Sequence, residues 1–292
     1  MIGPEAAIYE PIPFDRDEFT GSPVQVIAIA GGKGGVGKSS LAVNLAIALA
    51  EERHRVLLMD ANLGMANIDV LLNLKAEHNL SHVIHEEKQL QDIILDGPGG
   101  IKIVPAASGI SKMAKLSSAE NAALVNAFST LPYDIDTLII DTAAGITPSM
   151  LTFCEASKEV MVVVCDEPTS ISDAYATIRV LNQEHGVQRF RVVANKIESS
   201  QQGLELYNKL ARIADQELDV LLDFSGSIPL DAHLQKSVRE QSAVVSSYPR
   251  SRAALAFKKL ASRVNRWPKP DNPDGHLEFF VERLLKISNK VR

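Results

Sequence analysis

The amino-acid sequence predicts an α/β protein with a single doubly wound, mostly parallel sheet and helices on both of its faces. Two observations lead to this fold class. Short apolar runs alternate with longer amphipathic segments along most of the chain. The short runs are continuous in valine, isoleucine and leucine, which is typical of strands buried on both faces. The predicted strands are 24–30, 55–60, 101–104, 137–141, 160–165, 190–194 and, more weakly, 223–228.

The intervening segments predict helices at 37–52, 118–129, 170–185 and 203–216. Residues 1–23 are proline-rich and aperiodic, so we expect a mobile leader there. Residues 24–266 form the predicted main domain. Three prolines and a glycine in 267–275 break the preceding helix, and a last amphipathic helix is expected at 276–288, within a terminal segment 267–292.

Composition restricts the class of protein. The 292 residues are 46% hydrophobic and 23% charged, which is sufficient for a substantial core. The net charge of −6 counts against a general nucleic-acid coat. Cys154 and Cys165 lie in apolar runs without CxxC spacing, as expected for reduced thiols. We find no secretory signal and no uncharged stretch near the ~20 residues of a membrane span, so we expect a cytoplasmic protein.

The strongest motif is GGKGGVGKSS, which lies between a predicted strand and a predicted helix. Its glycines allow backbone N–H groups to turn toward phosphates, and the helix N-terminus adds a favourable dipole. Lys38 is expected to reach the β- and γ-phosphates of ATP, and Ser39 to bind Mg²⁺. The predicted phosphate-binding residues are Gly32, Lys33, Gly34, Gly35, Val36, Gly37, Lys38, Ser39 and Ser40.

Two aspartates end strands that we expect to flank the phosphate-loop strand. Asp141 ends TLIID, where it would hold Mg²⁺ together with Ser39. Asp60 ends RVLLMD at the same edge of the sheet, where ligands bind in such folds. One aspartate at a strand end is often only a helix cap, but two favour a magnesium site. Gly145 follows as a switch glycine.

The motif KGGVGKS resembles the deviant Walker A box of the ParA/MinD family of P-loop ATPases. In that family the first lysine crosses a dimer interface and neutralises charge on the partner's ATP. The resemblance implies a homodimer in the ATP state, with Lys33 as the crossing residue. The alternative is that Lys33 is a solvated loop lysine.

Five longer segments resemble the FlhG/FleN branch, the flagellar-number regulators. They are 60–74, 104–109, 141–146, 165–178 and 272–285. The resemblance implies a cytoplasmic ATPase that restrains an enhancer-binding master activator of the FleQ type, with the GTPase FlhF at the cell pole as a second partner. It also implies ATP and Mg²⁺ as cofactors and adenine contacts at Asn195 and Pro229.

Two departures from the family pattern refine this expectation. Asn62 stands where the first switch usually carries a second aspartate. An amide cannot accept a proton, so we expect slow turnover by a catalytic set of Lys33, Lys38, Asp60 and Asn62. The leader also lacks the glutamine-containing stretch that stimulates FlhF, which favours the antiactivator role.

The last predicted helix has an apolar stripe of Leu277, Phe280, Val281, Leu284 and Leu285. As in MinD, such a stripe could lie on a membrane surface, and ATP would release it from the domain. The alternative is packing on its own domain or on a partner. Acidic residues on the same helix oppose binding to anionic lipid.

Three other functions compete with this interpretation. A ParA-type partition ATPase would coat DNA through a basic C-terminal surface, which the net charge opposes, so no direct DNA binding is expected. A MinD-type division-site ATPase differs only in the branch motifs. A metabolic P-loop enzyme or metal-cluster carrier would require a second pocket or a CxxC pair.

Overall fold

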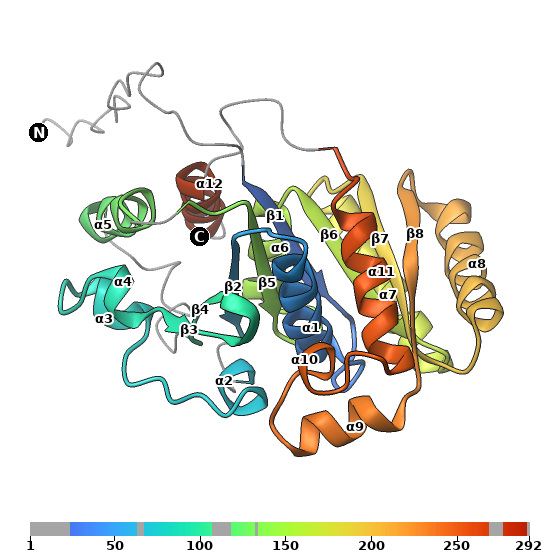
Figure 1. Cartoon of the computed structure of the whole chain (residues 1–292). Helices are drawn as coiled ribbons and strands as arrows, with labels where there is room; N and C mark the ends of the chain where they lie inside the picture. Colours follow the sequence, from blue (N-terminus) through green and yellow to red (C-terminus); the bar gives the residue numbers. More distant parts are fainter. Residues whose placement is uncertain (1–23, 63–66, 107–117, 132–133, 269–276, 291–292) are drawn as a thin grey trace, which may run out of the picture.

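The computed structural model describes residues 24–62, 67–106, 118–131, 134–268 and 277–290, so the predicted leader lies outside the described residues. Within them the chain forms an eight-stranded sheet in the order β3-β4-β2-β5-β1-β6-β7-β8 (Figure 1). Neighbouring strands are parallel except β3 and β4. The strands are β1 (Gln25–Ala30), β2 (Val56–Ala61), β3 (Leu95–Asp96), β4 (Lys102–Val104), β5 (Thr137–Thr142), β6 (Glu159–Cys165), β7 (Arg189–Ile197) and β8 (Leu221–Pro229).

Helices cover both faces of this sheet, so the predicted fold class is confirmed. They are α1 (Lys38–Glu51), α2 (Ile68–Leu71), α3 (Leu80–Ile84), α4 (Leu90–Ile93), α5 (Ser118–Ser129), α6 (Pro148–Ala156), α7 (Pro168–Gln183), α8 (Ser200–Glu217), α9 (Ala232–Arg239), α10 (Val244–Ser247), α11 (Arg252–Val264) and α12 (Leu277–Lys290). Each predicted strand has a counterpart. The two-residue strand β3 is too short to leave a pattern in the sequence.

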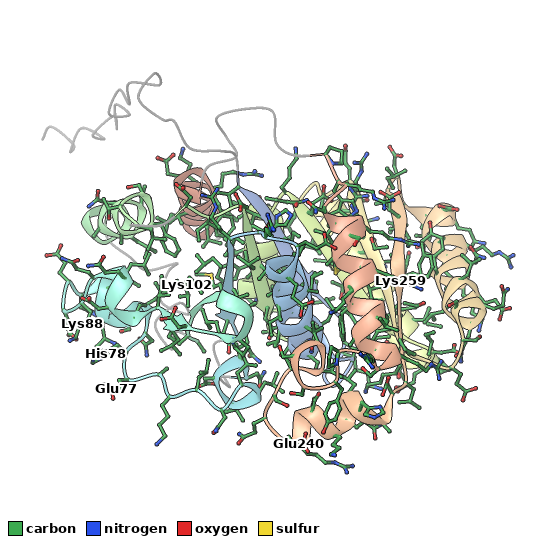
Figure 2. All side chains as sticks on the ribbon, in the orientation of Figure 1. Glu77, His78, Lys88, Lys102, Glu240 and Lys259 are labelled. Carbon is green, nitrogen blue, oxygen red and sulfur yellow. The ribbon has the colours of Figure 1, made fainter. Side chains whose placement is uncertain are left out.

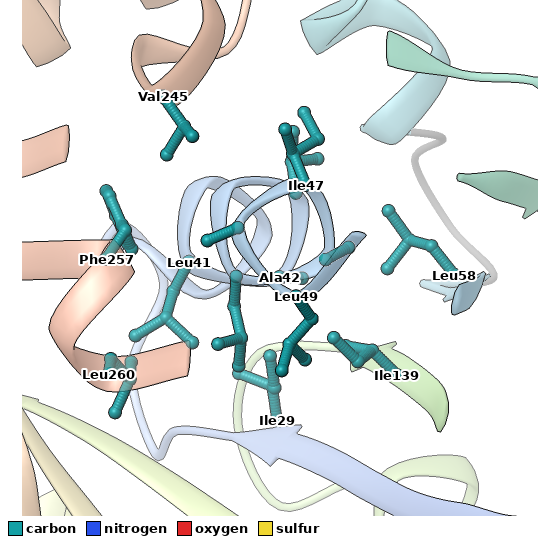
Figure 3. Close-up of a cluster of buried hydrophobic side chains, with 14 of the residues drawn as sticks. Ile29, Leu41, Ala42, Ile47, Leu49, Leu58, Ile139, Val245, Phe257 and Leu260 are labelled. Carbon is teal, nitrogen blue, oxygen red and sulfur yellow. The ribbon is translucent and has the colours of Figure 1, made fainter. Parts of the chain in front are cut away.

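The strands divide their apolar side chains between two faces because successive residues point in opposite directions. In β1, Ile27 and Ile29 join the core beneath α1 and α11, while Ala28 and Ala30 face the other side. Helix α1 is buried almost all round. Figure 3 shows its side chains between the sheet and the residues Val245, Phe257 and Leu260 of α10 and α11. This packing fixes the helix that follows the phosphate loop.

The C-terminal helix α12 is part of this domain. Its residues Phe280, Val281, Leu284 and Leu285 are buried against the sheet, with α5 and α6 as neighbouring helices. The side chain of Leu277 lies outside the described side chains. In this structure the apolar stripe of the last helix therefore faces the protein's own core, which is the alternative to membrane contact.

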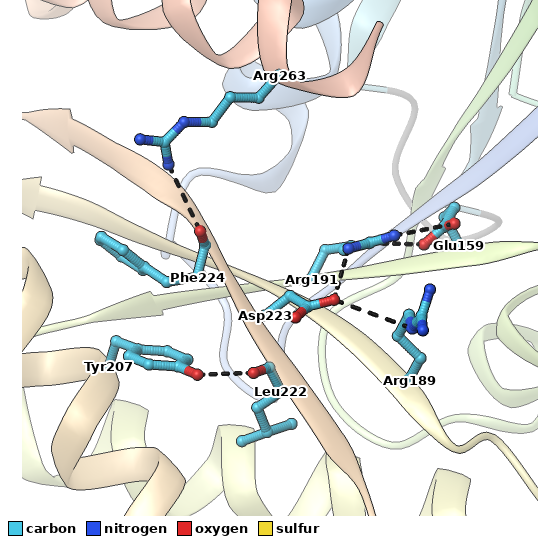
Figure 4. Close-up of polar contacts among 8 residues, drawn as sticks. All are labelled: Glu159, Arg189, Arg191, Tyr207, Leu222, Asp223, Phe224 and Arg263. Atoms are coloured by element: carbon cyan, nitrogen blue, oxygen red, sulfur yellow. Dashed lines mark hydrogen bonds and ion pairs between the residues drawn. The ribbon is translucent and has the colours of Figure 1, made fainter. Parts of the chain in front are cut away.

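A buried ion-pair cluster lies where β6, β7 and β8 begin (Figure 4). Arg191 Nε donates to Glu159 Oε2 at 2.7 Å, and Nη1 donates to Asp223 Oδ2 at 2.5 Å. The ring of Trp267 stacks on the guanidinium, with 4.4 Å from Cζ to the ring centroid. This contact fixes the residue three positions beyond the end of α11 against the sheet.

The edge strand β8 has carbonyl groups that its only neighbour β7 does not use. The Tyr207 hydroxyl donates to the Leu222 carbonyl at 2.6 Å, and Arg263 Nη1 donates to the Phe224 carbonyl at 3.5 Å (Figure 4). Arg263 Nη1 also donates to the Ser225 carbonyl at 2.9 Å. Gly226, at φ 144°, adds an irregularity to the pairing. Bonded carbonyls and a bulge protect an edge strand against pairing with another chain.

Candidate nucleotide-binding site

The phosphate loop connects β1 to α1 and depends on glycine. Gly35 and Gly37 have φ angles of 79° and 96°, in the left-handed region that side chains disfavour. A Cβ on Gly32 would lie 2.1 Å from the Asp173 carbonyl oxygen, and one on Gly37 would lie 2.3 Å from Asn195 Nδ2. The loop is therefore held close to α7 and β7, with its backbone turned toward the N-terminus of α1. Such a turn binds phosphate groups.

Lys38 is the first residue of α1, and its side chain is buried. Burial lowers the pKa of its ammonium group, and the nearby Asp141 carboxylate partly opposes this. A buried cation at the start of a helix is stabilised by an anionic ligand, because that ligand supplies the charge that the protein lacks. Lys38 therefore lies where a triphosphate would be bound.

Asp60 and Asp141 lie side by side, as paired residues of β2 and β5. Asp141 is buried, and among the described residues neither carboxylate oxygen has a well-formed hydrogen bond. Burial raises its pKa to about 7, although the nearby Ser39 hydroxyl and Lys38 offset part of this effect. Carboxylate and hydroxyl oxygens are ligands that Mg²⁺ prefers, and a bound cation would compensate the buried carboxylate. Ser39 and Asp141 therefore fit a magnesium ion.

Asp60 has a different environment. Its Oδ1 accepts a hydrogen bond from the Asn62 amide at 3.0 Å, and its Oδ2 accepts from Asn67 at 2.9 Å and Ile68 at 3.2 Å. Burial raises its pKa, and these three bonds act in the opposite direction. Asp60 thus binds the backbone at Asn62 and at the start of α2. Its role as a magnesium ligand stays a prediction, as does the catalytic role of Asn62.

Lys33 extends from the phosphate loop and forms hydrogen bonds with two side chains of the same chain. Its ammonium donates to Glu167 Oε2 at 2.7 Å and to the Thr169 hydroxyl at 3.1 Å, at the start of α7. The hydrogen bond to Glu167 raises the pKa of Lys33. Both side chains are about half exposed, so the pair can separate at low cost. Glu167 and Thr169 were missed from sequence, although they lie in the branch segment 165–178.

The end of β7 fastens the phosphate loop from the other side. Asn195 Nδ2 donates to the Val36 carbonyl at 2.7 Å, and the Lys196 ammonium donates to the Gly35 carbonyl at 2.7 Å. Lys196 has φ 57°, a left-handed conformation that a non-glycine residue keeps only under tertiary constraint. Pro229 is buried at the paired end of β8. Adenine contacts by Asn195 and Pro229 stay predictions, and Lys196 is an addition to the site.

The predicted second switch also contacts the loop. The Gly145 amide donates to the Gly31 carbonyl at 3.4 Å, with Gly145 at φ 77°. The Thr142 hydroxyl donates to the Ile29 carbonyl at 2.8 Å. These two bonds join the end of β5 and the segment after it to β1 and to the start of the phosphate loop. The role of Asp141 and Gly145 as a second switch stays a prediction.

Comparison with known proteins identifies the family. A ParA family model, described as an NUBPL iron-transfer P-loop NTPase, matches residues 23–265. The chain belongs to the ParA/MinD family of P-loop NTPases. Within this family, the antiactivator FleN of Pseudomonas aeruginosa is 54% identical over 264 residues, covering 90% of this chain and 94% of FleN. The predicted membership of the FlhG/FleN branch is confirmed.

Two further members of the family support the same placement. The flagellum site-determining protein YlxH of Helicobacter pylori is 32% identical, over 89% of each chain. The structure of MinD from Pyrococcus horikoshii, complexed with Mg-ADP, superposes with a TM-score of 0.65 at 25% identity, covering 83% of this chain and 96% of MinD. This ParA/MinD-family NTPase has, among its described residues, no helix of the length and apolarity that crossing a bilayer requires.

Proposed function

We propose that this protein is an ATP-dependent, dimerising antiactivator that limits flagellar number by restraining a FleQ-type master activator of transcription. One observation carries the proposal: 54% identity to the antiactivator FleN across almost the whole of both chains. The phosphate loop and the buried Asp141 support the nucleotide dependence. Membership of the P-loop NTPase family supports ATPase activity.

In this proposal the backbone of the phosphate loop and Lys38 bind the triphosphate, while Ser39 and Asp141 hold Mg²⁺. The bound ion would neutralise phosphate charge. Lys33 leaves Glu167 and Thr169 and crosses to the ATP of a second copy of the chain. Because Lys33 already has partners in its own chain, dimerisation exchanges one set of contacts for another.

Turnover in this dimer is expected to be slow because Asn62 cannot accept a proton. Asn62→Asp would supply the carboxylate and should speed phosphate release under single-turnover conditions. Asn62→Ala should leave the already slow rate lower still. Brisk release by the wild type, unchanged in Asn62→Ala, would exclude this part of the proposal.

Membrane contact through α12 would require the helix to leave its site in the domain, because Phe280, Val281, Leu284 and Leu285 are buried there. We propose that ATP drives this release, and we expect more protein to co-sediment with anionic liposomes in ATP than in ADP. Equal co-sedimentation would contradict the release. FlhF is the second proposed partner, at the inner membrane or cell pole.

The decisive test is a count of flagella per cell by electron microscopy in a strain that lacks this protein. We expect more flagella than in the parent, with the number restored by the wild-type chain and not by Lys38→Ala. An unchanged count would exclude flagellar regulation and leave an ATPase with a different client, such as a division-site or partition complex.

A further inference from the structure

Helix α11 presents a row of cations to solvent. Its exposed positions recur every three or four residues and so lie on one side of the helix: Arg252, Leu255, Lys259, Arg263 and, just beyond its end, Arg266. The opposite side is the buried apolar face over α1 and β8. We call these five exposed residues the α11 stripe. It extends for about 20 Å at 1.5 Å per residue.

The charge of this region differs from that of the rest of the chain. Residues 250–266 contain six Lys or Arg residues and no Asp or Glu. The segment carries +6 in a chain whose net charge is −6, so the remaining residues together carry −12. Glu51 and Glu52 of α1 contact the side of this helix, through Lys258, Ser262 and Asn265. The surface is still mainly cationic, and such a surface attracts an acidic partner and accelerates its association.

The cations of the α11 stripe are not neutralised by the protein itself. Lys258, at the side of the helix, pairs with Glu51 at 2.8 Å. Within the described residues, no carboxylate is within ion-pair distance of Arg252, Lys259, Arg263 or Arg266.

Two of the stripe's arginines are held in place by neutral groups. Arg252 donates to the Glu198 carbonyl at 3.2 Å, and Arg263 donates to the Ser225 carbonyl at 2.9 Å. These hydrogen bonds already restrict the two arginine side chains. The side chains would therefore lose less conformational entropy when a partner binds.

The middle of the stripe indicates the kind of partner. Leu255 lies between the cations and is 49% exposed. An apolar side chain surrounded by charges is typical of a protein interface, which has an apolar centre and a polar rim. A phosphate backbone offers no apolar pocket to such a residue, and one leucine inserts little area into a bilayer.

We propose that the α11 stripe is the docking surface for the client, and that the client presents Asp and Glu carboxylates around an apolar pocket for Leu255. This inference rests on the proposed function for the existence of a protein client. It adds the surface that the client contacts and the charge of the face that it offers. Whole-chain composition conceals this surface, because the acidic remainder outweighs it.

The test measures binding of the full-length chain, in ATP, to the purified FleQ-type activator at low and high ionic strength. Lys259→Glu with Arg266→Glu should weaken binding at least about tenfold, mainly through slower association, and should reduce its salt dependence. Leu255→Ala should weaken binding without changing the salt dependence. The matched control is Lys75→Glu with Lys88→Glu, which makes the same change in net charge at exposed residues elsewhere (Lys88 and Lys259 in Figure 2).

The outcomes separate the two proposals. Equal binding by the stripe variant and the wild type overturns the docking surface and leaves the antiactivator function intact. No binding by the wild type overturns both. Stripe-dependent binding to duplex DNA or to anionic vesicles, with activator binding unaffected, assigns the stripe to phosphate groups and overturns the protein partner.

Discussion

The two ends of the parallel strands differ in whether their buried charged side chains have partners of opposite charge. At the amino end, the buried Glu159 is matched by Arg191, which also binds Asp223 and stacks on Trp267. At the carboxyl end, the buried Asp141 has no cation in ion-pair contact among the described residues, and Lys38 is also buried without an ion pair there. A complete cluster stabilises the fold as it stands. An incomplete one costs stability, so we expect a ligand that supplies the missing charge at the carboxyl end to stabilise the fold.

Among substitutions that test this difference between the two ends, Arg191→Ala is expected to change the free energy of unfolding most. The substitution leaves Glu159 buried without its partner, which should reduce the free energy of unfolding by about 3 to 5 kcal/mol. Urea unfolding measures this change. Arg189→Ala is the control, because the exposed Arg189 makes a long ion pair with Asp223, at 3.9 Å. This substitution should reduce the free energy of unfolding by less than about 1 kcal/mol. Equal losses of unfolding free energy in the two variants would show that burial does not determine how much each ion pair contributes to stability.

Asp141→Asn should instead increase the free energy of unfolding of the protein without nucleotide. Because burial raises the pKa of Asp141 to about 7, the charged carboxylate destabilises the fold increasingly from about pH 4 to pH 7 and constantly above. The amide removes this cost, so we expect a gain on the order of 2 to 4 kcal/mol at pH 8 and almost none near pH 4. Thermal unfolding at both pH values measures it. The same variant should lose the stabilisation that Mg-ATP gives the wild type.

The control for Asp141 lies at the other end of the same strand. The hydrogen bond from Arg55 lowers the pKa of Asp136, so its ionised form stabilises the fold above its unfolded pKa. Asp136→Asn should therefore lower the melting temperature at pH 8, and the difference should vanish as the pH falls through the lowered pKa. A gain in both variants would contradict the contrast between the two ends.

Gly37→Ala tests the geometry of the phosphate loop. The new Cβ would lie 2.3 Å from Asn195 Nδ2, and the left-handed conformation of residue 37 disfavours any side chain. Either the Asn195 amide or the loop must therefore shift, which breaks the hydrogen bond from Asn195 to the Val36 carbonyl. We expect ATP affinity to fall about 10- to 100-fold, from strain of roughly 1 to 3 kcal/mol. Gly100→Ala is the control, with φ 82° and open space around it. It should affect stability but not the affinity measured by titration with a fluorescent ATP analogue.

The smallest effect is expected from Glu167→Gln. This change removes the charge that holds Lys33 within its own chain and leaves an amide of the same size. Lys33 should then be freer to cross to a second copy, so ATP-dependent dimerisation should become a few-fold more favourable by analytical ultracentrifugation. Weaker dimerisation would mean that Glu167 itself acts in the dimer.

Local pattern was sufficient for much of this structure. The phosphate loop, the strand runs and Asp141 each carry their signal within a few consecutive residues. Contacts between distant segments had no such signal, because Glu167 lies 134 residues from Lys33 and Lys196 lies 161 residues from Gly35. The α11 stripe was missed for a different reason: a whole-chain net charge averages over surfaces that the fold separates.

Trp267 is the only tryptophan of the chain, and it stacks on Arg191 at the amino end of the sheet. Its intrinsic emission therefore reports one location, the contact between Trp267 and Arg191. No tryptophan lies beside the phosphate loop, so ATP bound there cannot quench this emission by direct contact. A spectral shift on adding ATP would show that nucleotide bound at the carboxyl end of the strands changes the surroundings of Trp267 at their amino end.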